Sequence, residues 1–149
     1  MALQDNETLL NNVLISMAHS FLQYVSESWP WVSNAGQSLE EQVNVIAARQ
    51  RQDVADIVAL LNEREFPIDF GTFPTEYTDL QFLSLLGLLN LLDNSQQKVC
   101  NGISDAVTSL SAAGDEEGAA LLRAIEVRQR ESVSALKELH QELSKLASA

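Results

Sequence analysis

Residues 66–77 read Phe-Pro-Ile-Asp-Phe-Gly-Thr-Phe-Pro-Thr-Glu-Tyr, and this stretch decides how the two halves of the chain are connected. The helical pattern before it covers about 28 residues and predicts a helix about 42 Å long. An extended segment of about 12 residues reaches about 40 Å, which is enough to run the length of that helix. Four of the nine aromatic side chains lie in this segment, so we expect it to pack along the helices. The helices that flank it are therefore predicted to be parallel.

Outside this segment, apolar residues recur at the three- and four-residue spacing of amphipathic helices. Capping-box patterns that begin at Ser38 and Thr78 predict the starts of the second and third helices. Short connections predict that the first two helices and the last two helices each form an antiparallel hairpin. The predicted fold is a single all-α domain, a four-helix bundle of two antiparallel hairpins joined by a long crossover between helices 2 and 3. The domain spans residues 1–149, and its helices cover residues 7–28, 38–65, 78–111 and 115–146.

The chain is acidic, with 21 Asp and Glu against 9 Lys and Arg and a net charge of −12. This charge repels phosphate backbones and anionic membrane surfaces, so we expect no nucleic-acid partner and no membrane partner. The longest strongly apolar run, Leu80–Leu92, is shorter than the roughly 20 residues that span a bilayer. The single cysteine excludes an internal disulfide, and the acidic N-terminus lacks the basic start of a secretory signal. A cytoplasmic location is therefore predicted.

The predicted connectivity resembles the ferritin-like bundle over nearly the whole chain. Di-iron members of that family carry an inward Glu on the first and third helices and Glu-x-x-His on the second and fourth. The corresponding spacing here is Gln50-x-x-Asp53 on the second helix and Gln129-x-x-Ser132 on the fourth. The resemblance thus implies the fold together with a degenerate metal site, because neutral amides do not offset the dehydration of two divalent ions. The inward mid-positions expected on the first and third helices are Met17, Ser20 and Phe21, and Asp93, Gln96 and Gln97.

A layer of polar residues is predicted at the middle of the bundle, because Gln50 and Gln129 fall on the apolar stripes of their helices. Buried amides need hydrogen-bond partners, which Arg, Ser and Asp side chains nearby can supply. In the alternative, both glutamines lie at the flank of their helices in contact with water. The two helices also match at a constant offset of 79 residues, as a pseudo-twofold relation between the hairpins would produce. The predicted layer consists of Gln50, Asp53, Gln129 and Ser132, with Arg49, Arg128 and Glu126.

The sequence contains no recognisable catalytic constellation. His19 and His140 lie far from each other and from Cys100, and no nucleophile elbow or phosphate-binding loop is present. The sequence therefore favours a non-catalytic protein with no cofactor and a structural or protein-interaction role. Two alternatives remain, a small apolar ligand held in the core beside Gln50 and Gln129, and a divergent iron or manganese protein. The residues that such a metal would use are Asp53, Glu126, Glu131 and His19.

The first half of the third predicted helix carries leucine on every side, which is more apolar surface than a four-helix core covers. Burial of the surplus face against a second subunit predicts a homodimer, formed by this helix and the crossover segment. In the alternative, the aromatic side chains of the crossover cover the leucines within a monomer. The predicted dimer interface consists of Leu85, Leu88, Leu92, Phe70 and Phe73.

Overall fold

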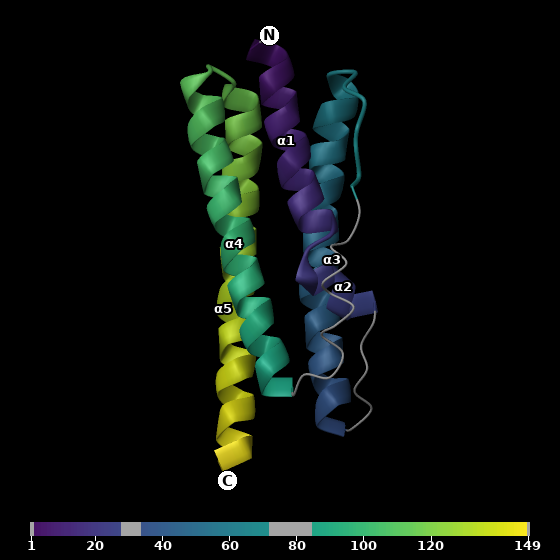
Figure 1. Cartoon of the computed structure of the whole chain (residues 1–149), viewed down its shortest axis with the longest axis vertical. Helices are drawn as coiled ribbons and strands as arrows, with labels where there is room; N and C mark the ends of the chain where they lie inside the picture. The colour runs from purple at the N-terminus through teal and green to yellow at the C-terminus, as the bar shows by residue number, and fades with distance from the viewer. Residues whose placement is uncertain (1, 28–33, 72–84, 149) are drawn as a thin grey trace.

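The computed structural model describes residues 2–27, 34–71 and 85–148, and these residues form an all-helical bundle (Figure 1). Both α1 and α2 pack against α3 and α4, so together they take the place of one rod in a bundle of four. Among the described residues, no helix is both long and apolar enough to cross a membrane. The helices are α1 (Ala2–Ala18), α2 (Phe21–Glu27), α3 (Asn34–Glu63), α4 (Leu85–Ala112) and α5 (Glu116–Ser148).

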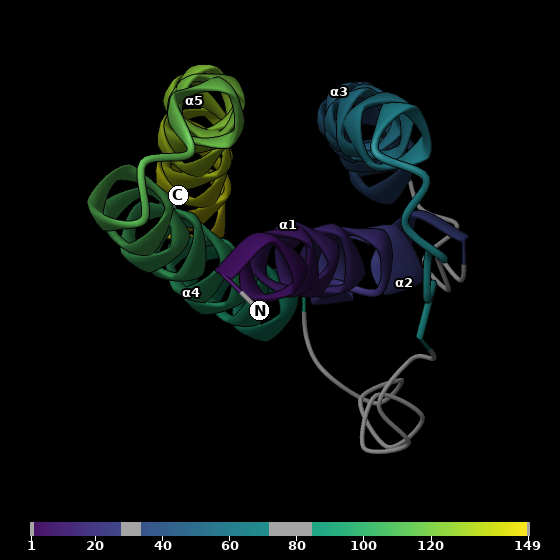
Figure 2. The ribbon, with the colours of Figure 1, turned by 90° about the horizontal axis from the view of Figure 1, so that it is seen from above.

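The rods alternate in direction around the bundle. In Figure 1, α1 runs downward from the N-terminus, α3 and α4 both run upward, and α5 runs downward to the C-terminus. The rod of α1 and α2 packs against α3 and α4, and α5 packs against the same two helices (Figure 2). Each of these neighbouring pairs is antiparallel, whereas α3 and α4 are parallel. The end of α3 and the beginning of α4 consequently lie at opposite ends of the bundle (Figure 1).

Three predicted features of the helices are wrong. The first helix begins at Ala2, five residues before the predicted start at Glu7. The first rod was expected to be continuous, but it breaks at His19 and Ser20, between α1 and α2. The second helix begins at Asn34, four residues before Ser38, since residues 34–37 contain no proline to stop the helix from extending. The predicted start at Thr78 lies outside the described residues. The last helix agrees with its predicted bounds to within two residues at each end.

Helices α3 and α4 end in the same hydrogen-bonded turn, the Schellman motif. At the end of α3, the backbone N–H of Phe66 donates to the carbonyl of Leu61 at 3.0 Å, and that of Glu65 donates to Asn62 at 3.0 Å. The motif places one residue in the left-handed region, which is Glu65 with φ 58° in α3 and Gly114 with φ 82° in α4. Only the second of these positions carries the residue type that takes this conformation without strain.

Residues 66–71, the described beginning of the predicted crossover segment, are hydrogen-bonded to α1 through Asp69, although Phe70 is exposed and does not pack as predicted. The side chain of Asn11 donates to the carbonyl of Asp69 and accepts from its N–H, both at 3.0 Å. Gly71 has φ 65°, and a Cβ atom there would lie 2.8 Å from Ile15 Cγ2, so the backbone approaches α1 as closely as only glycine allows. The rest of the segment lies outside the described residues.

The buried apolar residues form two separate clusters, one toward each end of the bundle. The first fills the end with the N-terminus of α1, and the second fills the other end around α2. The largest fully buried side chains of the first cluster are Leu10, Leu14, Met17, Ile57, Leu61, Ile103, Leu110 and Leu122. Those of the second are Leu22, Leu88, Leu89 and Leu92, packed with Phe21, Val43 and Leu136.

The predicted dimer interface is wrong at Leu88 and Leu92. These side chains are 2% and 0% exposed, because the second cluster encloses them within one chain, and they present no surface to a partner. Phe70 is 53% exposed. Phe73 and the side chain of Leu85 lie outside the described part of the structure.

Candidate functional site

Four glutamines, one from each rod, meet in the middle of the bundle. They are Gln23 of α2, Gln50 of α3, Gln96 of α4 and Gln129 of α5, and none is more than 3% exposed. Together with Ser20, Asp53 and Arg128 they form one hydrogen-bonded network, which we call the polar layer. The two apolar clusters lie on either side of it.

Gln50 is the centre of the polar layer. Its Oε1 accepts from Ser20 Oγ at 2.8 Å and from Gln23 Nε2 at 2.9 Å. Its Nε2 donates to the Oε1 atoms of Gln96 and Gln129, each at 3.0 Å. A side-chain amide has two lone pairs and two protons, so Gln50 is fully satisfied without water.

The layer continues from Gln129 to the surface of α5. Gln96 Nε2 donates to Gln129 Oε1 at 3.1 Å, and Gln129 Nε2 donates to Asp53 Oδ2 at 2.7 Å. Arg128 Nε then donates to Asp53 Oδ1 at 2.7 Å. Asp53 is 1% exposed, whereas the Arg128 side chain is 41% exposed, so the charge of the buried carboxylate is balanced by a guanidinium at the rim.

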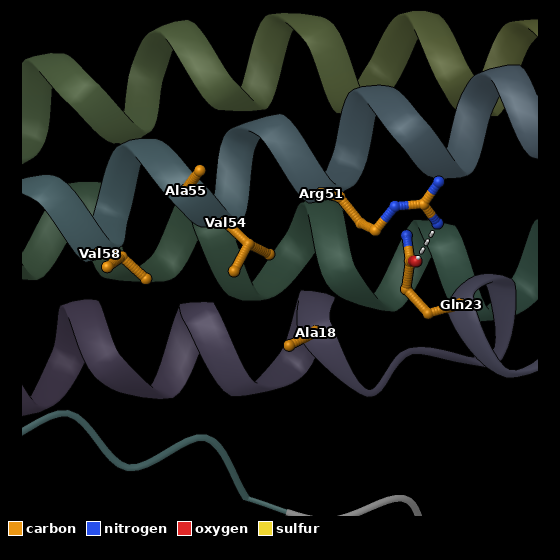
Figure 3. Close-up of a pocket in the computed structure, with 6 residues that line it drawn as sticks. All are labelled: Ala18, Gln23, Arg51, Val54, Ala55 and Val58. Carbon is orange, nitrogen blue, oxygen red and sulfur yellow. Dashed lines mark hydrogen bonds between the residues drawn. The ribbon is translucent and has the colours of Figure 1, made fainter.

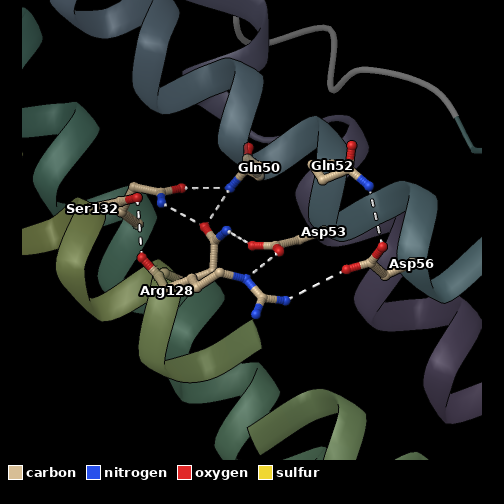
Figure 4. A network of polar contacts seen from close by, with 8 residues as sticks. Gln50, Gln52, Asp53, Asp56, Arg128 and Ser132 are labelled. Carbon is tan, nitrogen blue, oxygen red and sulfur yellow. Dashed lines mark hydrogen bonds and ion pairs between the residues drawn. The ribbon is translucent and has the colours of Figure 1, made fainter. Parts of the chain in front are cut away.

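A surface pocket of about 370 Å³ opens over this ion pair. Arg128 also lies 3.5 Å from Asp56 Oδ2, and the other oxygen of that carboxylate, Oδ1, accepts from the Gln52 side chain at 3.2 Å (Figure 4). The guanidinium is thereby held between two carboxylates of α3. The pocket is lined by Arg49, Gln52, Asp53, Asp56, Arg128 and Glu131.

The structure places Gln50, Asp53, Gln129 and Arg128 together in the layer. Ser132 is also buried, but its Oγ donates to the carbonyl of Arg128 one turn before it, at 3.3 Å. The hypothesis that both glutamines lie at a helix flank in contact with water does not hold, since both are completely buried.

Arg49 and Glu126 were wrongly placed in the layer. Arg49 is equivalent to Arg128 in the repeat with an offset of 79 residues. Arg128 binds Asp53, but the residue equivalent to Asp53 that Arg49 would bind is the uncharged Ser132. With no carboxylate to bind, Arg49 stays exposed. Glu126 accepts from Arg130 at 2.9 Å on the surface of its own helix, where this pair is one turn apart.

The residues considered for a metal are dispersed. Asp53 is bound to Arg128 and Gln129, and Glu126 is bound to Arg130. Glu131 is exposed at the rim of the pocket. His19 lies at the break of the first rod, near the backbone of Gly71. Among the described residues, no group of three or more His, Cys, Asp and Glu side chains is arranged to hold a metal ion.

The predicted layer lacked Ser20, Gln96 and Gln23; the first two were expected as inward positions of their helices, whereas the sequence did not indicate Gln23. The apolar pattern of the first rod was continued through Met17 and Phe21 as one helix, but the break at Ser20 turns α2 so that Leu22 and Gln23 face inward. No proline or glycine marks this break, so the sequence offers no local signal for it.

Cys100 lies one turn after Gln96 on α4 and is completely buried. Burial raises the pKa of its thiol, because the thiolate loses its hydration. The thiol therefore stays protonated and packs as a small apolar group.

The chain was compared with known proteins. No known family model matches it, and no curated protein resembles its sequence closely enough to count as a relative.

Proposed function

We propose that this protein is a non-catalytic bundle of ferritin-like topology, in which a neutral polar layer replaces the metal site of that architecture. Its role is structural or in protein interaction, exerted through the shape of the bundle. The observation that carries the proposal is the self-contained hydrogen bonding of the four glutamines.

The directions of the rods support the topology. The rod of α1 and α2 is antiparallel to α3, and α4 is antiparallel to α5, which gives two hairpins. The described part of α3 ends at one end of the bundle and α4 begins at the other. These positions support our proposal that a single long crossover joins the two hairpins, as in the ferritin-like bundle.

The charge of the layer supports the absence of a metal function. Asp53 contributes one negative charge and Arg128 one positive charge, and the glutamines are neutral, so the layer carries no net charge. A divalent ion needs several anionic oxygens to offset its dehydration. To bind one here, the amides would have to give up their mutual hydrogen bonds and the ion pair would have to break.

Metal analysis of protein purified without chelator tests this proposal. We expect iron and manganese far below one atom per chain, and no rise in the thermal unfolding midpoint when Fe²⁺ or Mn²⁺ is added, because a ligand that binds the folded state would raise it. Protein stripped with a chelator and then titrated with each metal is the matched control. Near-stoichiometric iron or manganese that survives dialysis would overturn the proposal.

We also propose that the interaction role includes self-association through the segment that ends at Gly71. Phe70 is exposed there, and the hydrogen bonds between Asn11 and Asp69 hold the segment in place beside it. Light scattering should give the mass of a dimer for the wild type and of a monomer for Phe70→Ser. A wild-type mass of one chain at the highest soluble concentration would refute self-association and leave the metal result unaffected.

A further inference from the structure

A groove of about 420 Å³ runs along the outer face of the bundle, between the end of α1 and the middle of α3 (Figure 3). It lies on the opposite side of α3 from the pocket over Asp53, and the two share no lining residue. Its volume is in the range of small-molecule sites. The groove is lined by Ala18, Gln23, Arg51, Val54, Ala55 and Val58.

One end of the groove carries an oriented guanidinium. Arg51 donates from Nη1 to Gln23 Oε1 at 3.0 Å, and Gln23 is 3% exposed. The Gln23 amide is itself fixed, because its Nε2 donates to the Ala47 carbonyl and to Gln50 Oε1, both at 2.9 Å. The polar layer therefore fixes the orientation of Arg51 through the hydrogen bond to Gln23.

Arg51 has hydrogen-bonding capacity that the described residues do not use. No carboxylate of the described residues lies within ion-pair distance of it, although the chain holds 21 acidic residues against 9 basic ones. The six lining residues include no carboxylate either. A guanidinium presents five donors in a planar fork that matches a carboxylate. Only one of them is occupied by Gln23.

The rest of the groove is apolar. Val54 and Val58 follow Arg51 on the same face of α3, and Figure 3 shows them facing Ala18 of α1. Arg51 and Val58 are seven residues apart, which is about 10 Å along a helix. The groove thus pairs a cationic end with an apolar wall long enough for a short hydrocarbon chain.

We propose that this groove binds a medium-chain carboxylate, with the carboxylate on Arg51 and the hydrocarbon tail along Val54 and Val58. The net charge of −12 disfavours a bare anion anywhere on this surface, so burial of the tail has to supply much of the binding. The groove borders the polar layer at Gln23, but the proposal does not rest on the proposed function, because octanoate binding needs no metal and no partner chain.

Calorimetric titration with octanoate tests the proposal, with octanol as the uncharged match and acetate as the match without a tail. We expect one saturable site for octanoate. Octanol and acetate should each bind at least tenfold more weakly, because the hydrogen bond to the charged group and the burial of the tail each contribute at least a factor of ten to the affinity. From hexanoate to octanoate, each added methylene should strengthen binding about fourfold.

Three variants locate the site. Arg51→Gln should weaken octanoate binding at least tenfold, and Ala55→Phe, at an exposed position on the rim, should block the groove. Arg49→Gln is the matched control, because it removes the same charge from an exposed position two residues away and should leave binding unchanged. Circular dichroism verifies that each variant is folded. Octanol binding as tight as octanoate, wild-type affinity in Arg51→Gln or Ala55→Phe, or an equal loss in Arg49→Gln would each overturn the proposal.

Discussion

Replacing Gln50 with methionine tests whether mutual hydrogen bonding holds the polar layer together. Methionine is flexible and of similar length, but it offers no amide. The change removes four hydrogen bonds. Two groups, the Ser20 hydroxyl proton and Gln96 Oε1, are then left with no hydrogen-bond partner among the described residues. An orphaned buried polar group costs about 1–3 kcal/mol. Allowing for the favourable burial of methionine, we expect a loss of about 2–4 kcal/mol in the free energy of unfolding.

The matched change is Gln96→Met, at a position that is also completely buried. Here every former partner keeps another hydrogen bond, because Gln129 Oε1 still accepts from Gln50 Nε2, and Gln50 Nε2 still donates to Gln129. Only one proton is orphaned, the Gln50 amide proton that pointed to Gln96, whereas Gln50→Met orphans two whole groups. We therefore expect Gln96→Met to cost about half as much as Gln50→Met, about 1–2 kcal/mol, although the chemical change is identical.

The double variant Gln50→Met, Gln96→Met separates this explanation from a simple loss of polarity. It removes the Gln96 oxygen that the first change orphans, but it also removes both donors to Gln129 Oε1, so the number of orphaned groups stays at two. The double variant should therefore be about as stable as Gln50→Met alone, and the two single losses should not add. Urea unfolding followed by far-ultraviolet circular dichroism gives the three free energies, with equal m-values as the check on the comparison. Equal losses in the two single variants, or losses that add in the double variant, would refute the reasoning.

Three further predictions concern single positions. Glu65→Gly should raise the free energy of unfolding by about 0.5–1 kcal/mol, because it relieves a left-handed backbone conformation and outweighs the entropy that glycine loses. Asp115→Asn should lower it by about 1–3 kcal/mol at neutral pH. The hydrogen bond from Arg64 lowers the Asp115 pKa below its ordinary 3.8. The wild type therefore loses this stabilisation as the pH falls through the lowered pKa, and the difference in free energy of unfolding between wild type and variant becomes smaller in acid. Gln129→Glu places a second carboxyl beside Asp53 Oδ2, which raises the pKa of the pair, so this variant should lose stability as pH rises above about 4.3. Urea titrations across pH measure all three.

Two of these predictions have a matched control variant, and the acid range of its own titration serves as the control for Asp115→Asn. Glu65→Ala retains the Cβ atom and should stay within about 0.5 kcal/mol of the wild type. Gln141→Glu adds the same charge to α5 at an exposed position and should show no comparable pH dependence. A lower free energy of unfolding for Glu65→Gly than for the wild type would contradict the argument from backbone strain. For Asp115→Asn, the contrary result is a difference in free energy from the wild type that stays constant into acid. For Gln129→Glu, it is a pH profile parallel to that of the wild type.

The positions of Gln50 and Gln129 could be predicted because both fall on the apolar stripes of long, regular helices. The contribution of Gln23 could not, since a two-residue break with no proline or glycine changes which side of α2 faces inward. Helical periodicity gives the direction of a stripe only while the helix is continuous. A second limit of periodicity explains why Leu88 and Leu92 were wrongly assigned to a dimer interface. Periodicity does not show how much of the circumference of α4 the neighbouring helices cover.

The sequence repeat relates the two hairpins, and one difference between its two copies makes the polar layer asymmetric. Arg49 and Arg128 are equivalent at an offset of 79, as are Asp53 and Ser132. Only Asp53 carries a charge, so only Arg128 is drawn to the layer, and Arg49 remains in solvent. The side chain that recruits an arginine here belongs to the neighbouring helix, which no pattern along a single helix reveals.

Glutamine and a metal ion are alternative solutions to the same electrostatic problem at the centre of this bundle. Four carboxylates in place of the four amides would lie about 3 Å apart, and each ionised pair would repel by about 5 kcal/mol at an effective dielectric constant of about 20. Only a bound cation or protonation would offset that repulsion. The amides avoid it by donating to and accepting from one another, and this leaves the centre closed. The polar groups that remain accessible to a ligand are therefore the arginines at the rims, Arg51 and Arg128. Of these, only Arg51 lacks a carboxylate partner among the described residues.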